Sequence, residues 1–86
     1  MNDATRSTRA FLKSMPPLDA ETYLQGFKLP PLHYKIMYLL YVDKVPDIVQ
    51  ATYKLADQHI HISIFKAGRV HREALSWITK NLLKTR

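Results

Sequence analysis

The feature that most constrains the fold is a series of apolar residues in the last third of the chain, spaced three or four positions apart. This spacing places the side chains on one face of a helix. The pattern therefore predicts a long C-terminal helix. Its apolar face consists of Ile60, Ile64, Ala67, Val70 or His71, Ala74, Ile78 and Leu82.

The first part of this passage also carries a strand signal. The segment 59–65 alternates between polar and apolar residues, and its three isoleucines favour extended backbone. A single strand without a pairing partner is not stable, and no other segment offers a clear partner. We therefore predict that the helix begins near Asp57, which would act as its N-cap, and the choice between helix and strand over His59–Phe65 stays open.

Two proline pairs, Pro16-Pro17 and Pro30-Pro31, divide the preceding part of the chain, because the residue before a proline avoids helical geometry. Short helices are predicted over 3–15 and, with Asp19 as N-cap, over 20–25. Longer patterns predict helices over 32–42 and 46–55. The expected fold is all-α, a small domain of four to five helices. Residues 1–31 would form N-terminal short helices and proline-bounded linkers, and residues 32–86 a helix-turn-helix domain with a C-terminal helix.

Composition narrows the function. The 86 residues include no cysteine, which excludes disulfides, thiolate metal sites and thiol nucleophiles. The net charge is +6, and residues 58–86 alone carry +5, from six basic side chains and one acidic. Such a balance favours an anionic partner. The longest apolar run covers only residues 36–42, far short of the about 20 residues of a membrane span, so we expect a soluble, cytoplasmic protein without a membrane partner.

Two helices meeting at a tight break, preceded by a third, are the layout of a tri-helical helix-turn-helix. The second helix after the break would read DNA, with polar side chains addressing base edges and basic ones addressing phosphates. The candidate DNA-binding residues are Gln58, His59, His61, Ile62, Ser63, Lys66, Arg69 and Arg72. The alternative is a helical bundle with a solvated basic face.

The segment from Tyr34 to Ile78 carries a family resemblance, through Tyr34, Leu40-Tyr41-Val42, and Ile60, Ile64 and Ala67 within Ile-His-Ile-Ser-Ile-Phe-Lys-Ala. It resembles the C-terminal helix-turn-helix of the lambdoid-phage late-gene antiterminators, the Q-type proteins, and its layout is similar to region four of sigma factors. The resemblance implies a phage-related transcription regulator that binds DNA in a bacterial host cell, with RNA polymerase as a partner. The chain departs from that pattern: the stretch between Val42 and Ile60 is one residue shorter and has no glycine.

No arrangement of residues predicts catalysis or a cofactor, and we expect no enzyme activity. His59 and His61 would point apart on a helix and share a face only on a strand, so no metal site is predicted. His33 and His71 are interpreted as boundary residues with one polar edge in water.

The final helix is amphipathic and holds the single tryptophan. Trp77, Ile78, Leu82 and Leu83 form more apolar surface than one short bundle obviously covers. We predict a homodimer closed by the final helix, with Trp77, Ile78 and Leu82 at its interface. A second function class fits the same charge pattern. A basic chain of this size could be a small phage- or bacterium-encoded protein-binding module that inhibits or modulates a host protein.

Overall fold

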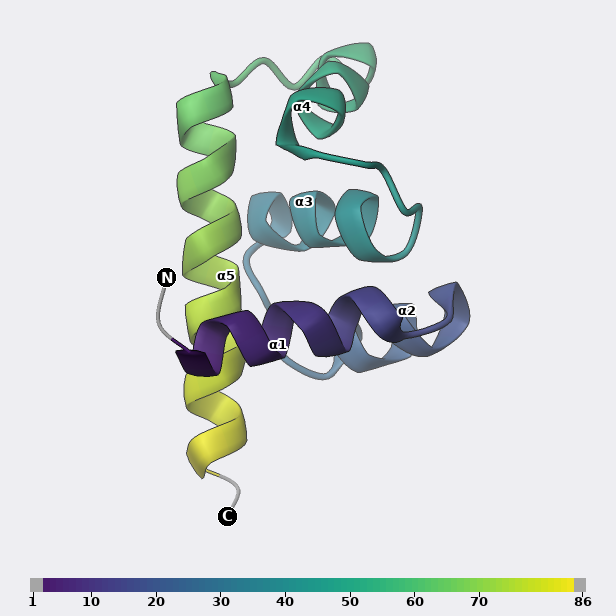
Figure 1. Ribbon diagram of the computed structural model, residues 1–86. Helices are drawn as coiled ribbons and strands as arrows, with labels where there is room; N and C mark the ends of the chain where they lie inside the picture. Colours follow the sequence, from purple (N-terminus) through teal and green to yellow (C-terminus); the bar gives the residue numbers. More distant parts are fainter. Residues whose placement is uncertain (1–2, 85–86) are drawn as a thin grey trace.

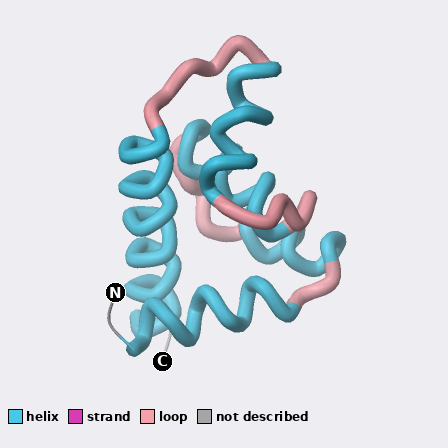
Figure 2. Tube along the Cα trace, turned by 45° about the horizontal axis from the view of Figure 1, so that its top comes forward, coloured by secondary structure: helices cyan, strands magenta, loops and turns pink. Residues whose placement is uncertain are grey.

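The computed structural model describes residues 3–84, and over this range the chain forms helices and loops without a strand (Figure 2). The helices are α1 (Asp3–Ser14), α2 (Pro17–Gln25), α3 (Pro31–Tyr41), α4 (Ile48–Asp57) and α5 (Ile64–Lys84). Figure 1 shows α5 as a long upright helix, with α1 crossing its lower half and α2, α3 and α4 stacked beside it. The prediction of a small all-α domain is confirmed.

The N-termini of three helices follow from local sequence. Pro17 and Pro31 occupy the first positions of α2 and α3, where a missing N–H costs nothing. Asp19 therefore lies in the first turn of α2, and its predicted role as N-cap is wrong. Asp47 is the N-cap of α4, because its carboxylate accepts a hydrogen bond from the backbone N–H of Gln50 at 2.9 Å.

The end of α4 explains the largest error in the predicted boundaries. Asp57 is the last residue of α4 rather than the N-cap of the next helix. His59 follows in a left-handed conformation, with φ of 64°. Its N–H donates to the carbonyl of Ala56, and the N–H of Ile60 donates to the carbonyl of Leu55 at 2.9 Å. This is a Schellman C-cap with histidine in the place usually taken by glycine.

The passage over His59–Phe65 is consequently neither the predicted helix nor the alternative strand. Residues 58–63 form a loop, and α5 begins at Ile64. The hydroxyl of Ser63 accepts a hydrogen bond from the backbone N–H of Lys66 at 3.0 Å and so caps the first turn of α5. Most of the predicted apolar face points inward, from Ala67 to Leu82, and Ile60 packs against the core from the loop. Ile64 was predicted on the same face but is 45% exposed, so that part of the prediction is wrong.

Two groups of buried side chains hold the helices together. The first core joins α1, α2 and α3 to the C-terminal half of α5 and contains Leu12, Ala20, Leu24, Met37, Tyr41, Val42, Ala74, Leu75 and Ile78. The second core joins α3 and α4 to the N-terminal half of α5 and contains Ile36, Leu39, Val45, Ala51, Leu55, Ala67 and Val70.

The predicted boundary between residues 31 and 32 does not separate two cores. Leu12 and Leu24, which precede it, are fully buried together with Met37 and Ile78, which follow it. The radius of gyration is 12.3 Å, close to the roughly 12 Å of one compact domain of this length. Within the described range, none of the helices is long and apolar enough to cross a membrane.

Candidate nucleic-acid interface

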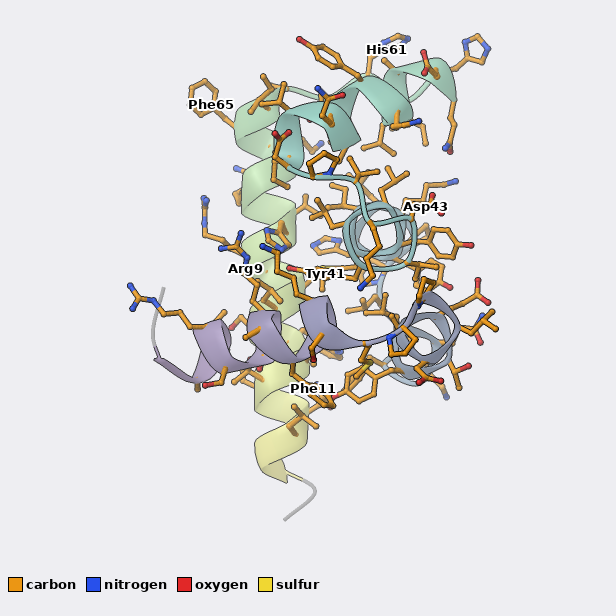
Figure 3. All side chains as sticks on the ribbon, turned by 45° about the vertical axis from the view of Figure 1, so that its right-hand side comes forward. Arg9, Phe11, Tyr41, Asp43, His61 and Phe65 are labelled. Atoms are coloured by element: carbon orange, nitrogen blue, oxygen red, sulfur yellow. The ribbon has the colours of Figure 1, made fainter. Side chains whose placement is uncertain are left out.

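The first two turns of α5 carry several exposed side chains. Phe65 is 90% exposed, and Figure 3 shows its ring directed away from the helices behind it. Ile64, Lys66 and Arg69 are exposed on the same turns. Ala67 and Val70 are buried in the second core and fix this part of α5 against α3 and α4. The N-terminal end of α5 therefore presents two cations and two apolar side chains on a rigid support.

The structure divides the eight predicted DNA-binding residues into two groups. Lys66, Arg69 and Arg72 lie on α5, spaced three residues apart and all exposed. The other predicted residues lie in the loop before α5 and not on a recognition helix. They are Gln58, His59, His61, Ile62 and Ser63.

Of the five predicted residues in the loop, only the two histidines have exposed side chains without a hydrogen bond or core contact among the described residues. His59 and His61 are exposed, and His61 lies at the far end of the molecule in Figure 3. The amide oxygen of Gln58 accepts a hydrogen bond from Lys35 at 3.4 Å and faces α3. Ile62 packs against the second core, and Ser63 caps α5. Three of the predicted base-reading residues thus have structural contacts of their own.

A second set of cations lies on α1, which the sequence analysis did not assign to a site. Arg6, Arg9 and Lys13 are all exposed. Their spacing of three and four residues places them on one face of α1, and this spacing was the sequence signal that could have found them. Arg9 and Lys13 line one pocket together with Arg72 of α5, so these three cations share one surface.

A buried polar pair lies beneath this surface. The hydroxyl of Tyr41 and Nε2 of His71 are 2.7 Å apart, and both side chains are buried. Burial, together with the charges of Arg9 and Arg72, lowers the pKa of His71 to about 4. Burial raises the pKa of Tyr41 to about 12, although Arg9 acts in the opposite direction. Both groups are neutral at pH 7, and the interpretation of His71 as a half-exposed boundary residue is wrong.

His33 has a partner that the sequence did not indicate. Its Nε2 lies 3.1 Å from a carboxylate oxygen of Glu73, which links the start of α3 to α5. This is the only contact within 4 Å between a basic and an acidic side chain among the side chains described, which are those of residues 4–82. The cations of α1 and of the first half of α5 therefore have no carboxylate partner within that distance.

The predicted dimer seam is only partly on the surface. Ile78 is fully buried in the first core, and Leu82 packs against that core. Ile78 consequently has no area to offer to a second chain. Trp77 is 50% exposed, and its indole N–H donates to the carbonyl of Phe27 at 3.2 Å. Most of the apolar surface that suggested a dimer is instead buried within one chain.

The comparisons with known proteins found nothing similar: no protein-family model, no curated protein and no solved structure matches this chain. The resemblance to late-gene antiterminators therefore stays a prediction that rests on the residues that suggested it. Within the described residues, no three side chains of the types that bind metal ions lie together. The interpretation of the site depends on its own geometry and charge.

Proposed function

We propose that this chain is a DNA-binding transcription regulator that presents the first two turns of α5 to the major groove. The observation that carries the proposal is the combination of Phe65, Lys66 and Arg69, exposed on turns whose opposite face is locked into the second core. In this proposal α3, α4 and α5 act as the three helices of a helix-turn-helix, with the loop of residues 58–63 in place of a shorter turn.

The chemistry of these side chains fits such a role. Arg69 and Lys66 can donate hydrogen bonds to guanine edges or to phosphates, and an apolar side chain such as Phe65 can contact a thymine methyl group. Arg9 of α1 adds charge beside α5, and phosphate contacts of this kind supply most of the sequence-independent affinity for DNA.

The biological setting comes from the resemblance alone. It supports a phage-related protein that acts in the cytoplasm of a bacterial host, in antitermination or a similar step, with RNA polymerase as partner. A homodimer belongs to the same proposal, because two recognition helices would read two half-sites. Of the residues predicted to close it, Trp77 is the one with substantial exposed surface.

The test is binding of a fluorescent 20-base-pair duplex, measured by anisotropy over a series of salt concentrations. Arg69→Gln should weaken binding severalfold and reduce the slope of log affinity against log salt by roughly 0.9, the contribution of one phosphate contact. Lys80→Gln is the matched control, because Lys80 is an exposed cation on the same helix, about 16 Å further along. Equal effects of the two variants, or no binding by the parent, would contradict the proposal.

A second candidate function is supported by a different feature of the same region. Phe65 and Tyr53 are exposed aromatic residues, and Tyr53 is 60% exposed. Large exposed aromatic side chains are enriched at protein interfaces. A module that binds a host protein should be captured with its partner from a nuclease-treated bacterial lysate, and Phe65→Ala should abolish the capture. Loss of capture after nuclease treatment would instead favour DNA.

A further inference from the structure

A pocket of about 330 Å³ opens where α1, α3, the start of α4 and α5 meet. Its cationic lining comes from Arg9 and Lys13 of α1 and Arg72 of α5. In Figure 3 the side chain of Arg9 extends from α1 toward Tyr41. The Tyr41 hydroxyl lies 2.7 Å from Nε2 of the buried His71, which also lines the pocket. The pocket thus has a cationic rim and a floor of two neutral polar side chains.

No described residue forms an ion pair with the cations of the rim. Arg9, Lys13 and Arg72 have no carboxylate within 4 Å in the described part of the molecule. Asp47 is the only acidic residue that lines the pocket, and its carboxylate is engaged as the N-cap of α4. Like charges gathered at one site repel one another, and a bound anion would remove that cost.

The rim is held in place before any ligand binds. The ammonium group of Lys44 donates to the carbonyls of Lys13 and Met15, at 3.0 and 2.7 Å, and so ties the end of α1 to the α3–α4 connection. The hydroxyl oxygens of Thr8 and Thr79 lie 2.7 Å apart in the buried contact between α1 and α5. The helix that carries Arg9 and Lys13 is therefore fixed against the helix that carries Arg72, which reduces the entropy lost on binding.

We propose that Arg9, Lys13 and Arg72 form a binding site for a single phosphate group. The guanidinium groups of Arg9 and Arg72 can each donate two parallel hydrogen bonds to phosphate oxygens, and Lys13 adds a point charge. The pocket, at about 330 Å³, has ample room for one phosphate group. The floor contributes the Tyr41 hydroxyl and no negative charge.

The source of the phosphate rests on the proposed function. A chain that places α5 on DNA would hold one backbone phosphodiester in this pocket, because Arg72 lies one turn beyond Arg69 on α5. A phosphomonoester or inorganic phosphate has the same recognition chemistry. The binding site itself depends only on the geometry of α1 and α5 and not on DNA.

The experiment is an NMR titration of the full chain with sodium phosphate and, at matched ionic strength, with sodium acetate. The signals of the Arg9 and Arg72 side chains and of the His71 ring report on the pocket. Phosphate should shift them in a saturable way, and acetate should bind at least fivefold more weakly. Arg9→Gln should lower phosphate affinity at least tenfold, as expected for the loss of charged hydrogen bonds, and Arg9→Lys should lower it less.

Arg6→Gln is the matched control, since Arg6 lies one turn earlier on α1 and does not line this pocket. It should leave phosphate binding unchanged. The site is refuted by shifts that do not saturate, by equal binding of acetate, or by equal effects of Arg6→Gln and Arg9→Gln. Because Arg9 and Arg6 are exposed, both variants should fold, and their backbone spectra will verify it.

A duplex arm of the same experiment separates this proposal from the proposed function. Duplex binding that is weakened by Arg69→Gln but untouched by Arg9→Gln, together with no saturable shift from inorganic phosphate, would overturn the phosphate site and leave the proposed function standing. Phosphate binding that depends on Arg9, without any duplex binding, would support the site with a free phosphate or phosphomonoester as its ligand and overturn the proposed function.

Discussion

The regions around the two cores differ in whether their exposed aromatic side chains have partners within the chain. Around the first core the exposed aromatic residues still have partners: the ring of Phe11 packs edge-on against Tyr23, with centroids 5.5 Å apart, and Trp77 donates to the carbonyl of Phe27. Around the second core, Phe65 and Tyr53 make no aromatic contact within the described residues. The exposed aromatic side chains around the first core therefore pack against neighbours, whereas those around the second core extend into solvent.

The composition of the cores agrees with that difference. The first core contains Tyr41 and Met37 and is surrounded by four further aromatic residues, Tyr23, Phe27, Tyr34 and Tyr38. The second core contains only aliphatic side chains and is completed by residues of the loop, Ile60 and Ile62. We infer that the first region supplies most of the stability and that the second region supports a binding surface.

The sharpest test of this inference compares one buried and one displayed residue. Ile78→Ala removes a fully buried side chain of the first core and should lower the free energy of unfolding by about 2–5 kcal/mol. Phe65→Ala removes a larger side chain that is almost wholly in water and should change it by less than about 0.5 kcal/mol. Urea unfolding of both variants measures the two values. A similar loss from both would mean that Phe65 belongs to the packing, and the comparison would fail.

The second test acts at the junction of the two regions. His71 follows Val70 of the second core, and its partner Tyr41 belongs to the first. Because the pKa of His71 is lowered from 6.5 to about 4 in the folded chain, the unfolded chain takes up a proton first as the pH falls. Stability should therefore be complete above about pH 6.5 and decline as the pH falls toward 4, by up to about 3 kcal/mol.

Urea unfolding at pH 7.5 and pH 5 measures this loss, and an NMR titration of the His71 ring gives its pKa directly. His71→Phe should remove much of the pH dependence over this range. His61→Gln is the matched control, since His61 is exposed in the loop, and it should leave the pH dependence in place. Acid sensitivity that survives His71→Phe would assign the effect to other groups.

The sequence predicted the features that depend on regular spacing. The inward face of α5 and the helices that follow the proline pairs were found because apolar periodicity and proline geometry are local signals. The start of α5 was missed because His59 ends α4 without a glycine, the usual marker of a left-handed C-cap. The Tyr41–His71 pair and the pocket that Arg9 and Arg72 both line bring together residues far apart in the chain, and no local pattern encodes them.

The smallest expected effect concerns His59, in the loop before α5 for which the sequence left helix and strand as alternatives. His59 holds a left-handed backbone conformation that costs a residue with a Cβ roughly 1 kcal/mol or more. His59→Gly relieves that cost but gives the unfolded chain more freedom, so a net gain of up to about 1 kcal/mol in stability is expected. His59→Val should destabilise the chain, because a β-branched residue fits this conformation worst. If this passage were instead a helix or a strand, glycine would be the destabilising substitution and valine the better tolerated one.

His59 is exposed and lies at the other end of the loop from Phe65, so neither variant should alter the first two turns of α5 directly. A change in duplex binding that accompanies the change in stability would therefore show that the loop and the binding surface are coupled.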